Sequence, residues 1–258
     1  MSRALRAEWT KLRTVPSTIW LLLAVVTATV ALGLVADAAA RCPSAGCHLD
    51  PARTGLTGIY LGQAIVVVLA VPAISGEYGS GMIHLTFAAM PRRTVVLAAK
   101  AVTVTGLTLS AGIPAVLGSL LAGRLVLPGH GFTAAHGIPP LSPTDGSVLR
   151  AAVGSVLYLG LIALLSLGVA AAVRDAATAI GTVLGLLYLL PILTTVLGGS
   201  DLARHLRQLS PMTAGLTVQA TTDLRGLPIA PWAGLGVLAA WAAAALLAGG
   251  LLLHFRDA

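Results

Sequence analysis

The fold of this chain is decided by residues 66–100, VVVLAVPAISGEYGSGMIHLTFAAMPRRTVVLAAK. The apolar run at its start, Val66–Val71, gives way to the polar and glycine-containing segment Ser75–Gly81. Two arginines, Arg92 and Arg93, then precede a second long apolar run. The pattern predicts a chain that crosses a membrane, turns at a basic surface and crosses back.

The composition of the whole chain supports a membrane protein. The 258 residues are 57% hydrophobic and 10% charged, whereas roughly a quarter of the residues of a soluble domain are charged. The long runs are apolar on all sides and do not alternate as barrel strands do, so they predict helices. The net charge of +7 is explained by basic loops held at the cytoplasmic face, and no aromatic-rich basic patch indicates nucleic acid as a partner.

The predicted fold class is all-α, a single polytopic domain with six transmembrane helices. An even number of spans places both termini on one side of the cell membrane, and the basic N-terminus makes that side the cytoplasm. Lys100, about two turns into the third span, is expected to extend back to the cytoplasmic surface. The six predicted spans are residues 19–36, 58–74, 94–121, 149–173, 176–197 and 232–253.

Residues 1–14 predict an amphipathic helix that lies on the membrane lipid at the cytoplasmic surface. Leu5, Trp9 and Leu12 fall on one helical face, and basic residues, Lys11 and Arg13 among them, fall on the remainder. A plain basic tail that only fixes the orientation is the alternative.

The segments between spans give further expectations. Residues 41–57 form the first outer loop, in which Cys42 and Cys47 could form a small-loop disulfide or stay free thiols; a metal site there is less favoured. The end of the first span resembles a signal-peptidase site, and an uncleaved span is preferred. Residues 123–150 are rich in Gly, Pro and His and predict a long outer loop. Short outer-face helices are expected within Leu202–Leu224.

Two features of spans four and five can be read directly. Only Arg174 and Asp175 separate these spans, which predicts a tight cytoplasmic hairpin. Gly181 and Gly185 have the Gly-x-x-x-Gly spacing of a close-packed helix face, a weak signal in glycine-rich spans.

The sequence lacks the residues and motifs that several classes of membrane protein need, which narrows the range of possible functions. The predicted spans carry no Asp or Glu at mid-depth, as ion-coupled carriers usually require. The sequence contains no phosphate-binding loop, no His-Glu-x-x-His motif and no Gly-x-Ser-x-Gly elbow. A transporter of this kind would need a partner that supplies energy at the cytoplasmic face, through the N-terminal helix, residues 75–93 or the 174–175 hairpin.

Several motifs, in order along nearly the whole chain, resemble permease subunits of exporter-type (type 2) ATP-binding-cassette (ABC) transporters, particularly those of actinobacteria. They are Glu8–Thr14, Gly76–Tyr78 with Gly81–Ile83, Pro91–Lys100, Leu209–Pro211 with Pro231–Leu235, and Arg256–Ala258.

The resemblance implies a permease subunit that pairs into a homodimer or heterodimer and binds two separate ATPase subunits, which hold the ATP and Mg. This chain would then be no enzyme and would carry no cofactor. The resemblance places Glu77, Tyr78, Arg92 and Arg93 near the ATPase, with the N-terminal helix beside them. A solvated turn is the alternative for Glu77, Arg92 and Arg93. A non-transporting assembly or sensory protein is the alternative for the whole chain, and an intramembrane enzyme is disfavoured. The substrate is not readable from the sequence, and outward transport rests on the resemblance.

Overall fold

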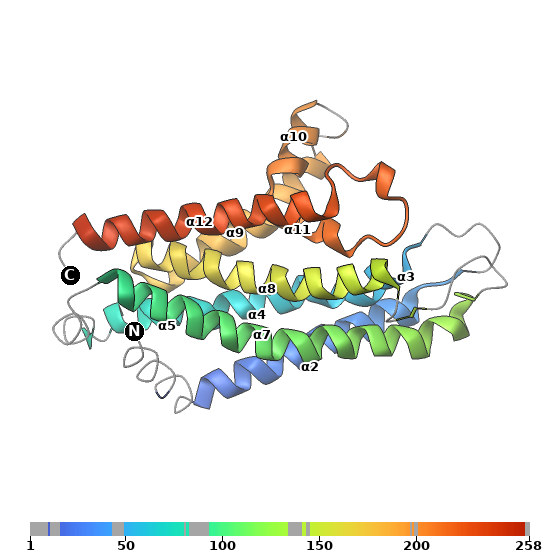
Figure 1. The fold of residues 1–258 in the computed structure, drawn as a ribbon, viewed down its shortest axis with the longest axis horizontal. Helices are drawn as coiled ribbons and strands as arrows, with labels where there is room; N and C mark the ends of the chain where they lie inside the picture. Colours follow the sequence, from blue (N-terminus) through green and yellow to red (C-terminus); the bar gives the residue numbers. More distant parts are fainter. Residues whose placement is uncertain are drawn as a thin grey trace.

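The protein is a bundle of long antiparallel helices (Figure 1). The computed structural model describes residues 10, 16–42, 49–79, 81–82, 93–133, 141–142, 145–196, 198 and 201–255. Within these ranges all regular structure is helical, which confirms the all-α class. Six helical segments are long and apolar enough to cross a membrane: Pro16–Ala39, Pro51–Gly79, Arg93–His130, Gly146–Val173, Ala176–Val196 and Pro231–Phe255. The chain is therefore a multi-pass membrane protein.

The elements follow one another in a simple order. The long helices are α2 (Pro16–Ala39), α4 (Ile59–Ala70) continued by α5 (Pro72–Gly79), α7 (Arg93–Val126), α8 (Gly146–Val173), α9 (Ala176–Val196) and α12 (Pro231–Phe255). The short elements are α3 (Pro51–Gly55), α10 (Asp201–Leu209), α11 (Pro211–Gly215) and the 3-10 turns η1 (Leu56–Gly58), η2 (Leu127–His130), η4 (Leu216–Gln219) and η5 (Leu224–Gly226).

Helix α8 lies at the centre of the bundle, with α4, α7, α9 and α12 packed around it, while α2 packs on α4 and α7 (Figure 1). Small residues permit the closest approaches. A Cβ added to Gly249 of α12 would lie 2.6 Å from the carbonyl oxygen of Gly168 in α8. A Cβ on Gly58 would lie within 2 Å of the Thr29 carbonyl oxygen. Backbones that approach this closely are typical of helices packed within a membrane.

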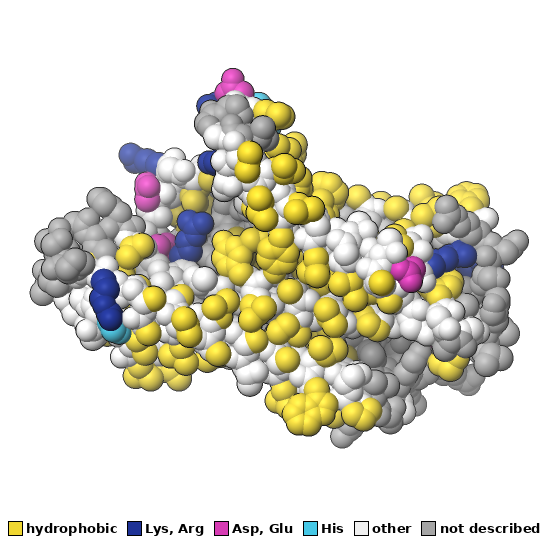
Figure 2. All heavy atoms as spheres, turned by 180° about the vertical axis from the view of Figure 1, so that it is seen from behind, with side chains coloured by type: hydrophobic (Ala, Val, Ile, Leu, Met, Phe, Trp, Pro, Cys, Tyr) yellow, Lys and Arg dark blue, Asp and Glu magenta, His cyan; other side chains and the backbone are white. Residues whose placement is uncertain are grey.

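The surface has the pattern expected for a protein in lipid. Hydrophobic side chains cover the middle of one face, and charged side chains on that face lie toward its two ends and on the projection that contains α10 (Figure 2). Exposed apolar residues such as Trp20, Leu121 and Leu189 belong to the long helices. A soluble protein does not expose so large an apolar area, so this belt is the surface that lipid covers.

Several predicted boundaries are wrong. Helix α2 continues past residue 36 to Ala39 and so includes Asp37, because a single polar residue does not stop a helix. The segment between the third and fourth spans is shorter than the predicted loop at residues 123–150, since α7 and η2 reach His130 and α8 begins at Gly146. The second span begins at Pro51 and extends to Gly79. Short helices within Leu202–Leu224 are confirmed by α10, α11 and η4.

Candidate functional site

Charged and aromatic side chains meet at the end of the bundle where α5 ends and α7 begins. Figure 1 shows that the start of α7 and the end of α5 lie at the same end of the bundle. We call Glu77, Tyr78, Arg93, Lys100 and Arg174 the polar junction. They come from α5, the first two turns of α7 and the corner between α8 and α9. In a bundle otherwise filled with apolar residues, such a group of charges needs a physical explanation.

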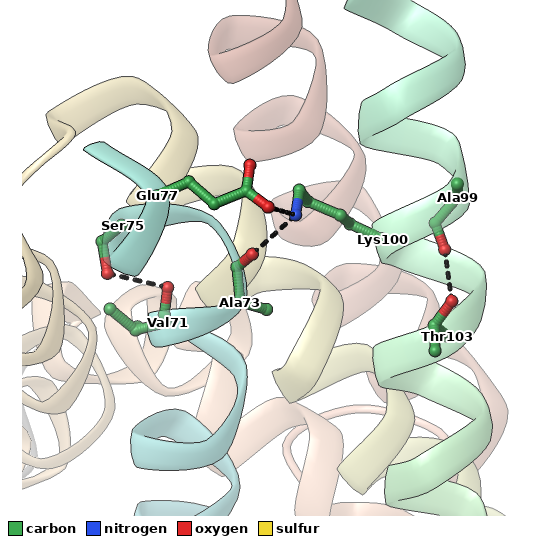
Figure 3. A network of polar contacts seen from close by, with 7 residues as sticks. All are labelled: Val71, Ala73, Ser75, Glu77, Ala99, Lys100 and Thr103. Atoms are coloured by element: carbon green, nitrogen blue, oxygen red, sulfur yellow. Dashed lines mark hydrogen bonds and ion pairs between the residues drawn. The ribbon is translucent and has the colours of Figure 1, made fainter. Parts of the chain in front are cut away.

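The local sequence explains how Glu77 reaches the interior. Pro72 has no N–H, so the helix that begins as α4 cannot continue its hydrogen-bond pattern and is interrupted at Val71. The Ser75 hydroxyl donates a 2.9 Å hydrogen bond to the Val71 carbonyl at this interruption. Helix α5 then carries Glu77 toward α7 (Figure 3).

Lys100 and Glu77 form a buried ion pair. Lys100 Nζ lies 2.7 Å from Glu77 Oε1 and donates a second hydrogen bond of 2.9 Å to the Ala73 carbonyl (Figure 3). The side chains are 0% and 3% exposed. Removing either partner of such a pair leaves an uncompensated buried charge, which costs about 3–5 kcal/mol. The pair therefore joins α5 and α7 firmly.

The α8–α9 corner contributes Arg174. This residue ends α8 in a left-handed conformation with φ of 67°, and its N–H donates to the Ala170 carbonyl at 2.9 Å. Its guanidinium carbon lies 5.1 Å from the centre of the Tyr78 ring, a cation–π distance. Asp175 then caps α9 by accepting 2.8 Å and 2.6 Å hydrogen bonds from the Thr178 N–H and hydroxyl. The predicted tight hairpin is confirmed.

Arg93 ties the start of α7 to the last turn of α12. Its guanidinium donates a hydrogen bond to the Leu253 carbonyl. A carbonyl in the last turn of a helix has no partner within that helix, so a cation is favourable there. Through these contacts the polar junction connects α5, α7, α12 and the α8–α9 corner at one end of the bundle.

The structure contradicts one alternative and one prediction in this region: the solvated turn for Glu77, and the extension of Lys100 to the surface. Glu77 does not lie in an exposed turn, because α5 extends to Gly79 and buries the side chain. Lys100 does not extend to the membrane surface but is buried against Glu77, whose carboxylate compensates its charge. Tyr78 and Arg93 are half-buried. Contact of these residues with an ATPase stays a prediction.

Other predicted residues fall outside the described part of the chain. Arg92 lies there, as do all five residues named for the N-terminal helix: Leu5, Trp9, Lys11, Leu12 and Arg13. Cys42 is disulfide-bonded and buried beside Leu127 and Phe132, and Cys47, its predicted partner, lies outside the described residues.

Sequence reasoning missed the role of Arg174 and the pairing of Lys100 with Glu77. One signal was available for the pair. A lysine inside an apolar run and a glutamate just after the preceding apolar run are opposite charges on consecutive antiparallel helices, at the same end of both. The rotation of each helix about its axis decides whether they meet, and residue spacing alone does not give that rotation.

A second buried polar group lies deeper in the bundle. The side-chain oxygen of Gln63 in α4 accepts a hydrogen bond from the Tyr158 hydroxyl of α8. Its side-chain N–H donates a 3.3 Å hydrogen bond to the Met212 sulfur of α11. All three side chains are buried. The Tyr188 hydroxyl of α9 donates to the Tyr60 carbonyl nearby. These bonds fix α8, α9 and α11 on α4, and they have the satisfied geometry of a structural network.

The described residues hold no group of three or more His, Cys, Asp or Glu side chains that could bind a metal ion. The polar junction instead joins helix ends to one another through an ion pair, a hydrogen bond and a cation–π contact. Comparison of the chain with protein-family models found no match, and comparison with curated proteins found no similar sequence.

Proposed function

We propose that this chain is the permease subunit of an ABC transporter, which moves a substrate outward by alternating access driven by a separate ATPase subunit. Two permease chains, identical or different, would form the transport unit, and ATP and Mg would bind to the ATPase. The resemblance of the sequence to exporter-type permeases motivates the proposal, and the polar junction supports it.

The buried pair between Lys100 and Glu77 is the observation that carries the proposal. Glu77 belongs to residues 75–93, the segment expected to contact the ATPase, and Lys100 belongs to α7, the helix that begins at the end of that segment. Because breaking the pair is costly, a force on this segment moves α5 and α7 together and does not separate them. Arg93 and Arg174 pass the same displacement to α12 and to the α8–α9 corner.

Such a connection suits a protein that takes its energy from a partner. Closure of two ATPase subunits on nucleotide would displace residues 75–93, and the connected helix ends would carry that movement into the membrane. The junction would then convert a movement at the cytoplasmic surface into a change of helix packing, as rigid helix ends joined by discrete contacts do in other switching proteins.

Capture of the partner tests the proposal. The tagged full-length chain is purified from membranes of its native cells, and the preparation is assayed for a bound ATPase and for ATP hydrolysis. Reversal of charge at Arg92 and Arg93 should weaken capture or uncouple hydrolysis from transport. Arg204→Glu is the matched control, because Arg204 is an exposed residue of α10, far along the sequence from the junction.

The outcome also separates the alternative. If a thermal unfolding transition shows that the chain is folded and no ATPase is captured from native membranes, a non-transporting assembly or sensory protein is favoured. Equal capture and coupling by wild type and the Arg92 and Arg93 variants would remove these two arginines from the contact.

A further inference from the structure

An apolar groove lies between α7 and α8 near the end of the bundle opposite the polar junction. Its volume is about 180 Å³, and its walls include Leu117, Leu121, Val148, Leu149 and Ala152. Arg124 is the charged residue among its lining. Leu141, from the segment between the two helices, also lines the groove. The other lining residues belong to helices long and apolar enough to cross a membrane, so their exposed side chains face lipid.

The packing of the two helices explains where the groove begins. Deeper in the membrane α7 and α8 touch closely: a Cβ added to Gly112 would lie 3.4 Å from Leu159, and one added to Gly160 would lie 3.4 Å from Leu109. Toward the helix ends, larger and exposed side chains replace these contacts. Leu117 and Leu149 are 58% and 55% exposed. The groove is thus a lateral opening above a closed contact.

The groove has the chemistry of a hydrocarbon site. Its lining is apolar except for Arg124, so filling it with hydrocarbon is more favourable than filling it with water. The rise from Leu117 to Arg124 is about 10 Å, roughly a third of the thickness of the hydrocarbon core. An acyl chain that enters beside Arg124 and runs toward the membrane centre would lie along this length.

Arg124 gives the site its charge preference. It lies in the last turn of α7, where the helix leaves the apolar layer. Its side chain is exposed, and no described residue forms an ion pair or hydrogen bond with it. A guanidinium group matches the oxygens of a phosphate in a two-bond geometry. A long cationic side chain near the end of a membrane-spanning helix can reach the phosphates of lipid headgroups.

We propose that this groove binds an anionic phospholipid, with one acyl chain between α7 and α8 and the phosphate on Arg124. Two independent features indicate the class of ligand: the apolar groove between membrane helices suits an acyl chain, and the cation at its mouth suits a phosphate. The site is separate from the proposed ATPase contact, because it lies at the other end of α7.

Lipid-dependent thermal unfolding of the purified full-length chain tests the site. Phosphatidylglycerol should stabilise the wild-type protein at concentrations about tenfold lower than it stabilises the Arg124→Gln variant. This is the loss of affinity expected when one charge-assisted hydrogen bond is removed. Phosphatidylcholine should show a smaller difference. Arg124→Lys should retain part of the preference. Ala152→Leu, which narrows the groove, should weaken the binding of both lipids to the same extent.

Arg53→Gln is the matched control, because it removes the same charge from the same end of the bundle but outside this groove. It should bind phosphatidylglycerol as the wild type does. The proposal is overturned if Arg124→Gln keeps the wild-type lipid preference, or if Arg53→Gln loses it equally. It is also overturned if inorganic phosphate alone stabilises the protein as phosphatidylglycerol does, since the site would then bind a free anion.

Discussion

Lys100 Nζ lies 2.7 Å from Glu77 Oε1 in a part of the bundle where neither side chain reaches solvent. The two residues are 23 positions apart and belong to helices α5 and α7, which run in opposite directions. Their pairing explains how an apolar helix tolerates a lysine. It also makes each residue depend on the other.

The first prediction concerns this dependence. Lys100→Met should lower the stability of the protein by about 3–5 kcal/mol, because Glu77 would remain buried without its cation. The double variant Lys100→Met with Glu77→Leu should recover most of the loss, since apolar pairs often replace buried ion pairs at little cost. Thermal unfolding in detergent measures both. A single variant as stable as the double variant would contradict the pairing.

The second prediction concerns the close contact of α12 with α8. Gly249→Val should destabilise the protein by at least about 1–3 kcal/mol, because its Cβ would lie 2.6 Å from the Gly168 carbonyl and the backbones would have to separate. Gly236→Val in the same helix is the control. Gly236 is exposed, and among the described residues nothing lies within 4 Å of an added Cβ. Equal melting temperatures for the two variants would argue against the tight contact.

The sequence was sufficient to predict the six spans because the membrane imposes a simple requirement. A helix that crosses hydrocarbon needs about 20 apolar residues, and that length is visible without any knowledge of packing. The Arg174–Asp175 corner was equally predictable, since two charged residues between two apolar runs leave room only for a tight turn. The same reasoning explains why the boundaries were less accurate: a polar residue such as Asp37 continues a helix when the protein interior covers it.

The contacts between helices were not predictable in the same way. Gly181 and Gly185 have the spacing of a packing motif, yet no described residue lies within 4 Å of a Cβ added to Gly181. Gly168 and Gly249, which do meet, belong to helices distant in sequence. Spacing identifies residues on one face of a helix, but it does not say which face turns inward. The buried position of Glu77 was missed for this reason.

The third prediction concerns pH. Hydrogen bonds from the Thr178 side chain and backbone lower the pKa of Asp175 from its ordinary value of 3.8. A lowered pKa in the folded state means that the cap contributes its stability above pH 3.8 and loses it as the pH falls through the folded value. Melting temperatures measured from neutral to acidic pH should therefore fall more steeply for the wild type than for Asp175→Ala.

A control separates this cap from general acid effects. Thr178→Val removes the hydroxyl that donates to Asp175 but leaves the carboxylate in place. It should reduce the acid sensitivity only in part, because the backbone N–H of residue 178 still donates. Identical pH profiles for the wild type and Asp175→Ala would show that the cap does not contribute measurably.

The last prediction concerns Asp37, which is completely buried in the final turns of α2. Neither of its carboxyl oxygens accepts a hydrogen bond from a described residue. Glycine backbone lies beside the carboxyl group: added Cβ atoms on Gly55 and Gly123 would lie 3.5 Å and 3.2 Å from Asp37 Oδ2. An ionised carboxyl group can only accept hydrogen bonds, whereas a side-chain amide can also donate them.

Asp37→Asn keeps the shape of the side chain and replaces a carboxyl group without hydrogen-bond partners by an amide that can donate as well as accept. It should therefore raise stability by about 1–3 kcal/mol, the usual cost of a buried group without a partner. The measurement is thermal unfolding, with Asp223→Asn as the control, since residue 223 is exposed and its left-handed backbone is one that asparagine tolerates. A lower melting temperature for Asp37→Asn would mean that the carboxyl group itself is required at this position.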